Sequence, residues 1–314
     1  MLQYLVILLD DTSVAYCHAD NPLKERNLMS LETLRKAILF GMKENLMIQY
    51  VYPDYELPEE YNEVIESIDH VKIGSEVFVY NNVPTSITAD NAVLRLTVAD
   101  FISKQYDIAA VLPQAKRLNI CITDVENFKD EHIEDYKKAL ATLNAVLLNQ
   151  YKAGKQPQVN ILTDRLQLDK MHNCDAGVNN ITVAPNGKFY LCPAFYYDER
   201  TGVNNRMNHH KPISDRSVGD LESGINIPNQ QLLKLDHAPL CRNCDAYQCK
   251  RCIWLNQRLT WDKNTPSHQQ CVLAHLERNA SRDLQKQLQT VGFALDNEIK
   301  EITYLDPFDV REEF

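Results

Sequence analysis

The sequence predicts an α/β protein, in which a partial (β/α)6-type barrel precedes a cysteine-rich module and a C-terminal helix. Two observations predict this fold. Through the first half of the 314-residue chain, short apolar runs rich in β-branched residues alternate with helical patterns. After Met171 this alternation stops, and seven of the nine cysteines lie between Cys174 and Cys271. The first pattern indicates a parallel sheet covered on both faces, and the second indicates a module that folds around what its cysteines bind.

The expected elements follow one another in a regular order. Strands are expected at residues 4–9, 46–52, 70–74, 76–80, 92–98, 119–124 and 158–164, and helices at 30–43, 59–68, 100–116 and 130–151. Connections between parallel strands are right-handed, so each helix crosses over one face of the sheet. About six such units suit an open barrel or a doubly wound sheet, because a full eight-unit barrel needs a longer chain.

We therefore expect three segments along the chain. Residues 1–168 form the partial barrel, 169–275 the cysteine-rich module, and 276–314 a helix with an acidic tail. Within the module, "NITVAPNGKFYLC" predicts a β-hairpin, because an Asn-Gly turn suits the positive φ angles of a tight hairpin. This hairpin is expected to bring Cys192 back towards Cys174.

Charge and hydropathy narrow the class of protein. The net charge is −10, and no run of Lys and Arg accompanies aromatic residues, so we expect no nucleic-acid partner. No stretch of 18 apolar residues occurs, so we expect no membrane span. The short apolar start lacks a basic region before it, which predicts a cytoplasmic protein without a signal peptide. In a reducing compartment, clustered cysteines hold a metal more often than they form disulfides.

The seven clustered cysteines are candidate metal ligands. They are Cys174, Cys192, the four in "CRNCDAYQCKRC" (Cys241, Cys244, Cys249 and Cys252), and Cys271. Seven thiols suit two 4Fe-4S clusters, one of which has a ligand other than cysteine or an open iron. Two zinc sites are the alternative, with an eighth ligand from His172, His209, His210, His237 or His268. A thioredoxin-like role is not expected, because neither CxxC pair opens a helix within a βαβ unit.

The spacing Cx12Gx4C, then Cx2Cx4Cx2C, then a last Cys resembles the SPASM domain that follows the barrel in many radical-SAM peptide-modifying enzymes. The family pattern has five and three residues where this chain has four and two. The resemblance implies one cluster at Cys174, Cys192 and Cys252, with His172 as a candidate fourth ligand. It implies a second cluster at Cys241, Cys244, Cys249 and Cys271.

The loop after the first strand departs from the radical-SAM pattern. Those enzymes carry Cx3Cx2C there, whereas "YLVILLDDTSVAYCHADNP" contains only Cys17. One thiolate cannot hold a 4Fe-4S cluster, so we expect no S-adenosylmethionine and no cleavage of it. Together with the rest of the chain, this stretch resembles the CXXX repeat peptide maturase family. That resemblance implies an iron–sulfur peptide-maturation protein, which acts on a ribosomally made, cysteine-rich precursor peptide with Cys-x-x-x repeats.

Other residues and other functions stay open at this point. Asp11, Cys17 and His18 are candidate catalytic residues, as a thiolate–imidazole pair or a metal site with Asp11. The alternative is a loop thiol beside a surface histidine, since adjacent side chains point apart. Asp100 and Asp124 are expected to cap helices, and Cys121 to lie in the core. The protein can also be a non-catalytic peptide-binding or electron-transfer partner of a separate modifying enzyme, or a zinc-stabilised binding protein.

Overall fold

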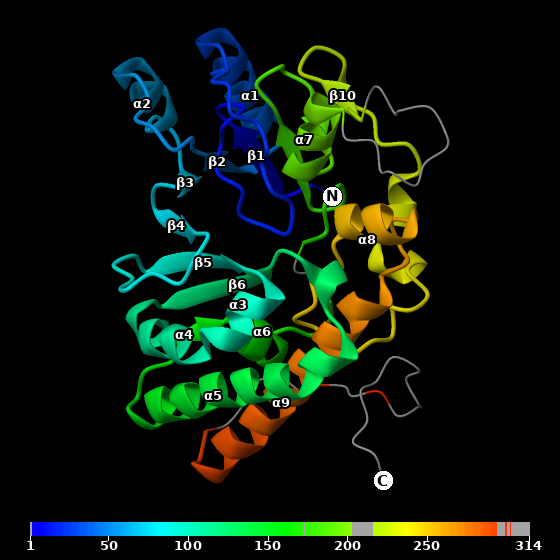
Figure 1. Ribbon diagram of the computed structural model, residues 1–314. Helices are drawn as coiled ribbons and strands as arrows, with labels where there is room; N and C mark the ends of the chain where they lie inside the picture. Colours follow the sequence, from blue (N-terminus) through cyan, green and yellow to red (C-terminus); the bar gives the residue numbers. More distant parts are fainter. Residues whose placement is uncertain (1, 172–173, 203–215, 294–298, 300–301, 303–314) are drawn as a thin grey trace. The chain divides into compact units, whose positions relative to one another are not determined.

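The computed structural model describes residues 2–171, 174–202, 216–293, 299 and 302. It is a mixed α/β structure with mostly parallel strands, as the sequence predicts. The chain forms two compact units, each assembled from several segments (Figure 1). The first unit contains Met1–Val77, Cys174–His237 and Cys252–Trp254, and the second contains Phe78–Asn173, Ala238–Arg251 and Leu255–Phe314. The expected division at residues 168 and 275 stays a prediction, and helix α9 (His268–Thr290) crosses residue 275 without a break.

The first unit is built on a sheet in the order β9-β8-β1-β2-β3. Its strands are β1 (Tyr4–Leu8), β2 (Met47–Val51), β3 (His70–Ile73), β8 (Asn180–Val183) and β9 (Phe189–Tyr190). All neighbours are parallel except β8 and β9. Most side chains of β1 are buried, because strands in the middle of a parallel sheet are covered on both faces.

Helix α1 (Leu31–Lys43) packs closely on this sheet. It begins after Ser30, whose hydroxyl accepts the backbone N–H of Thr33 at 3.1 Å and so caps the helix. A Cβ added at Gly41 would lie 2.9 Å from Cδ1 of Ile48, so a larger residue here would force the Ile48 side chain to shift. The remaining elements of the unit are α2 (Glu59–Ile65), α7 (Pro193–Thr201), β10 (Gly219–Asp220) and β11 (Gly224–Ile225).

The expected hairpin is present, but its turn differs from the expected one. β8 and β9 pair antiparallel, with Val183 opposite Phe189. The N–H of Gly187 bonds to the carbonyl of Ala184 at 2.9 Å, and Gly187 has φ +75°. Gly187 is the one residue of this loop with positive φ. The loop is therefore a type I turn followed by a left-handed glycine, a common three-residue hairpin connection.

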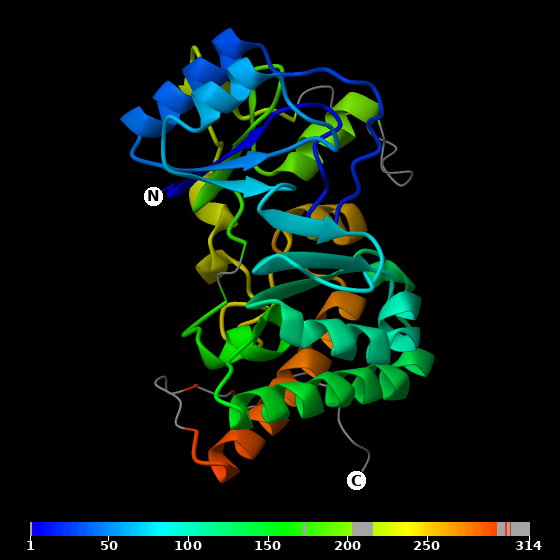
Figure 2. The same ribbon diagram turned by 90° about the vertical axis from the view of Figure 1, so that its left-hand side faces the viewer.

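The second unit contains the parallel strands β5 (Asn91–Leu96), β6 (Arg117–Ile122) and β7 (Gln158–Val159), in that order. Its longer helices are α3 (Val98–Ser103), α4 (Gln105–Val111), α5 (Ile133–Lys152) and α9. α5 and α9 lie side by side in both views (Figure 1 and Figure 2). Hydrogen bonds join these helices: Tyr136 Oη donates to Glu277 at 3.0 Å in a buried contact, and the Asn144 amide donates to the Ala280 carbonyl at 2.8 Å in a partly buried one. The chain passes between the units in β4 (Val77–Tyr80), and α8 (Ile253–Thr260) precedes α9.

The strand expected at 158–164 is only two residues long. At its third position the side chain of Asn160 replaces the backbone, since its Oδ1 accepts the N–H of Ile120 at 2.7 Å and its Nδ2 donates to the Ile120 carbonyl at 2.9 Å. The N–H and carbonyl of Ile120, on the edge of β6, are thus satisfied without a backbone partner. The chain is free to turn into the short helix α6 (Asn160–Thr163).

The expectation that Asp100 and Asp124 cap the helices that follow them is wrong, because Asp100 lies inside α3 and the Asp124 side chain makes no cap hydrogen bond to its own helix. Thr97 is the N-cap of α3, and Asp100 accepts its hydroxyl at 2.9 Å. Asp124, which follows β6, accepts the N–H of Val98 at 2.7 Å, in the preceding connection from β5 to α3. Cys121 lies in β6 and is buried in the core, as predicted. No helix in the described ranges is both long enough and apolar enough to cross a membrane.

Candidate metal centres

Four cysteines of the second unit line one small enclosed space. They are Cys241, Cys244, Cys249 and Cys271, called here the α9 thiol set. The first three lie on tight turns, in which the N–H of Cys244 bonds to the carbonyl of Cys241 and the N–H of Cys249 to that of Ala246. Cys271 lies in the first turn of α9, which Ser267 caps. Turns and a helix end thus direct four thiols into one space.

Hydrogen-bond donors approach the sulfur atoms of this set. The N–H of Ala246 points to Sγ of Cys244, and the N–H of Arg251 points to Sγ of Cys249, each at 3.5 Å. Nε2 of His275 lies 3.5 Å from the Cys244 sulfur. Such donors stabilise sulfur that carries negative charge, as metal-bound thiolates do.

His275 is a residue that the sequence analysis missed. It is buried, lines the same enclosed space, and stands four residues after Cys271 on α9. The signal was present, because a Cys and a His four apart on a helix share one face. His237 and His268, which were considered as ligands, are exposed, and neither lines this space. His172, His209 and His210 lie outside the described residues.

A buried ionic network holds the turn next to Cys244. The Asp245 carboxylate pairs with Arg278 at 3.0 Å and with Arg282 at 2.6 Å, and its backbone carbonyl accepts Nε of Arg165 at 2.9 Å. Asp245, Arg165 and Arg278 are almost fully buried. Burial alone raises the pKa of Asp245, but the charges of Arg278 and Arg282 outweigh it and hold the pKa below its ordinary value. The turn is therefore fixed by charges that must stay paired.

Burial dominates the protonation of these thiols. It raises the pKa of Cys244 to about 12, although the N–H of Ala246 and the charge of Arg278 act in the opposite direction. Burial also raises the pKa of Cys249 well above its ordinary value, and the nearby thiols Cys241, Cys244 and Cys271 add to the rise. A buried thiolate is thus unfavourable here unless a cation neutralises it. Within the described ranges, no three Cys, His, Asp or Glu side chains are arranged to hold a metal ion as they stand.

A second group of cysteines belongs to the first unit. It consists of Cys174, Cys192 and Cys252, called here the α7 thiol set. Cys192 is the N-cap of α7, and the Asn180 amide, at the start of β8, donates to the carbonyl of Cys174. Burial, and then the charges of Cys17, Cys252 and Cys174, raise the pKa of Cys192 well above its ordinary value. These thiols are therefore electrostatic neighbours, and Cys17 is among them.

Asp11 takes part in a contact with α7. Its carboxylate accepts the hydroxyl of Tyr196 and pairs with Nη2 of Arg200 at 2.9 Å. Asp11 is buried, while Cys17 and His18 are half-buried in the loop that follows. A catalytic role for Asp11, Cys17 and His18 stays a prediction.

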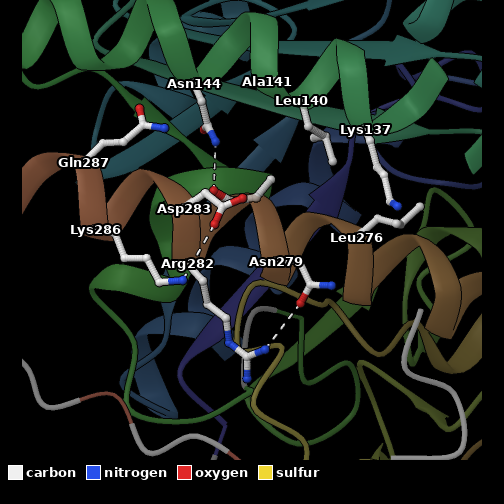
Figure 3. A pocket seen from close by; sticks show the side chains of 11 residues that line it. Lys137, Leu140, Ala141, Asn144, Leu276, Asn279, Arg282, Asp283, Lys286 and Gln287 are labelled. Carbon is white, nitrogen blue, oxygen red and sulfur yellow. Dashed lines mark hydrogen bonds and ion pairs between the residues drawn. The ribbon is translucent and has the colours of Figure 1, made fainter. Parts of the chain in front are cut away.

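A larger groove lies between α5 and α9 (Figure 3). Its volume is about 560 Å³, and its lining includes Lys137, Asp283 and Lys286. Lys286 lies 4.0 Å from Asp283, and both are exposed, so this pair contributes little to stability. The groove is lined by charged, amide and aliphatic side chains and by no thiol, so it offers none of the metal chemistry of the α9 thiol set.

None of the nine cysteines, all of which lie in described ranges, forms a disulfide. No protein-family model matches the chain, and no curated protein matches it. Solved structures do match. They include two of anSMEcpe, an anaerobic sulfatase-maturating radical-SAM enzyme, both with AdoMet bound.

The native anSMEcpe structure is 11% identical to this chain, with a TM-score of 0.50, and the match covers 91% of this chain and 98% of that one. The histidine-tagged structure is 10% identical, with a TM-score of 0.51, and the match covers 92% of this chain and 94% of that one. At such identities the likeness shows the fold alone. The chain has a radical-SAM-like α/β fold.

This likeness corrects one expectation. The sequence was expected to exclude S-adenosylmethionine, but both neighbours hold AdoMet on a similar fold, and the expectation is withdrawn. It depended only on the number of thiols in the loop after β1. The number of thiols shows whether a loop can hold an iron–sulfur cluster, but it does not show whether the protein binds S-adenosylmethionine. Loops at the carboxyl ends of parallel strands also bind nucleoside-like ligands through backbone and side-chain groups.

Proposed function

We propose that this protein is a radical-SAM-like peptide maturase that holds two 4Fe-4S clusters, one at the α9 thiol set and one at the α7 thiol set. Residues 1–168 would be a degenerate partial barrel, and residues 169–275 a SPASM-like cluster-binding domain. The substrate would be a ribosomally made precursor peptide with Cys-x-x-x repeats, modified in the cytoplasm with electrons from a redox partner.

One observation carries this proposal: four thiols and a histidine line a single enclosed space, with backbone N–H groups directed at two of the sulfurs. Buried thiols gain nothing from this arrangement as neutral groups. As thiolates they are soft ligands for an iron–sulfur cluster or zinc. A bound cluster supplies one-electron transfer, while the chain holds the sulfurs, excludes water and donates hydrogen bonds to them.

Zinc is the second candidate, and it also has an observation in its favour. The enclosed space measures about 20 Å³, roughly one water molecule in size. A single ion bound by four thiolates requires less movement of the turns than a cluster of four irons. A zinc-bound protein would bind the peptide without redox chemistry.

The proposal includes AdoMet because the similar structures hold it, so the test below includes AdoMet as a variable. The same neighbours are maturases, which supports a maturase-type role. A protein that binds the peptide but leaves it unchanged would instead act as the partner of a separate modifying enzyme.

The test is anaerobic purification and reconstitution with iron and sulfide, followed by metal analysis and an optical spectrum. We expect about eight irons per chain, from two clusters, and broad charge-transfer absorption. The loaded protein is then incubated with a Cys-x-x-x peptide, with and without AdoMet, and the peptide mass is measured. Stoichiometric zinc without that absorption contradicts the iron–sulfur proposal, and an unchanged peptide mass in both mixtures supports the non-catalytic partner.

A further inference from the structure

Helix α7 is a meeting point for segments that are remote in the sequence. Tyr196 and Arg200, on successive turns of the helix, both contact the Asp11 carboxylate that follows β1. Nε1 of Trp254 donates to Oδ2 of Asp198 at 2.9 Å. The first contact ties the loop after β1 to α7, and the second ties the segment that contains Cys252.

The loop after β1 is also fixed within itself. The amide of Asn21 donates to the carbonyls of Asp11 and Ser13, each at 2.7 Å, so both ends of the loop are held together. Cys17 lies between these anchors. The loop is therefore held beside α7 through Asp11, which contacts Tyr196 and Arg200.

We propose that Cys17 is the fourth thiol ligand of the metal site at the α7 thiol set. This inference depends on the proposed metal-binding function, and it names a ligand that the sequence pattern leaves open. The set has three thiols, and a four-thiolate site needs one more. Hydrogen bonds through Asp11 bring the loop containing Cys17 to the helix whose N-cap is Cys192.

The position at the start of α7 suits negatively charged sulfur. The helix has nine residues, and its first backbone N–H groups carry partial positive charge at the Cys192 end. The N–H of Ala194 approaches the Cys192 sulfur. Four thiolates around one metal site at this end are thus partly neutralised by the helix itself.

The experiment compares the full-length protein with four variants after the same anaerobic reconstitution. They are Cys17→Ser, Cys174→Ser, Cys244→Ser and, as a control outside both sets, Cys121→Ala. We expect Cys17→Ser to lower the metal content as far as Cys174→Ser does, to about half of the wild-type value, because one of two sites is lost. We expect Cys121→Ala to keep the full content.

A second measurement needs no variant. The wild-type protein is alkylated before and after metal removal by a chelator, and each cysteine is quantified by mass spectrometry. We expect Cys17 to be protected in the loaded protein and to react after chelation, in parallel with Cys174. Full metal content in Cys17→Ser, or equal alkylation of Cys17 in both states, overturns the inference while loss of metal in Cys174→Ser upholds the proposed function. Absence of metal from the wild-type protein overturns both.

Discussion

The two thiol sets are held in different ways, although both lie at helix starts. The α9 thiol set comes from one stretch of chain, residues 241–271, and a buried network around Asp245 fixes its turns. The α7 thiol set and Cys17 come from four segments between residues 17 and 252. Hydrogen bonds join the segments of Cys17 and Cys252 to α7, and that of Cys174 to the start of β8. Local turns and buried charges position the α9 thiol set, whereas the α7 thiol set depends on how the fold brings remote segments of the chain to α7. Each mode of construction fails under a different substitution.

The largest effect is expected at the buried network of the second unit. Replacing Asp245 by Ala leaves the guanidinium groups of Arg165 and Arg278 buried without their carboxylate. We expect a loss of about 3–5 kcal/mol in the free energy of unfolding, the usual range for breaking a buried ion pair. Chemical denaturation measures this loss, and limited proteolysis locates it in the turns of the α9 thiol set.

Asp11→Ala is the matched control in the first unit. Its partner Arg200 has a side chain that is 46% exposed, so water can replace the lost carboxylate. We expect a loss of about 1–3 kcal/mol, mainly from the unsatisfied Tyr196 hydroxyl. Equal losses of unfolding free energy in Asp245→Ala and Asp11→Ala would contradict the distinction between a buried ionic network and a partly exposed ion pair.

The edge strands of the two units also differ in how their hydrogen bonds are made. At the edge of the first unit's strands, β9 pairs with β8 through its backbone. At the edge of the second unit's strands, β7 pairs with β6 for two residues, and the side chain of Asn160 then takes the backbone's place opposite Ile120. Asn160→Ala leaves the N–H and carbonyl of Ile120 unsatisfied in a buried position. We expect a loss of about 2 kcal/mol, measured by denaturation. The exposed Asn127→Ala is the control, and a similar loss there would contradict this account.

Much of the fold could be predicted from the sequence, because buried parallel strands and amphipathic helices have their own periodicities. The strand expected at 158–164 failed for a local reason: nothing in the spacing of "QVNILTD" shows that the Asn160 amide imitates a backbone. The division of cysteines between the units was expected only through a family resemblance. The contact of the loop after β1 with α7 could not be predicted, because it joins Asp11 to residues 185 and 189 positions away.

The contribution of Asp245 to the free energy of unfolding should decrease as the pH falls. Its pKa in the folded protein is below the ordinary value of 3.8, so the folded state favours the charged form. This part of the stability is present above the unfolded pKa and is lost as the pH falls through the folded pKa. The difference in unfolding free energy between wild type and Asp245→Asn should be constant above about pH 5 and shrink in more acidic solution. A difference that stays constant down to about pH 2 would assign the stability to packing alone.

The smallest effect is expected at His275, whose Nε2 lies 3.5 Å from the Cys244 sulfur and can donate to it when this nitrogen is protonated. In the iron-loaded protein, a hydrogen bond from Nε2 to the Cys244 sulfur stabilises the more negative, reduced state. Loss of one such bond costs about 1 kcal/mol, or roughly 40 mV for one electron, so His275→Leu should lower the reduction potential of one cluster by about this amount. His275→Gln keeps an N–H donor on a side chain of similar reach and should restore most of the potential. Anaerobic redox titration followed by electron paramagnetic resonance measures both variants, and the signal from the other cluster provides the internal standard. If Leu and Gln shift the potential equally, His275 acts through packing, and the donor role is wrong.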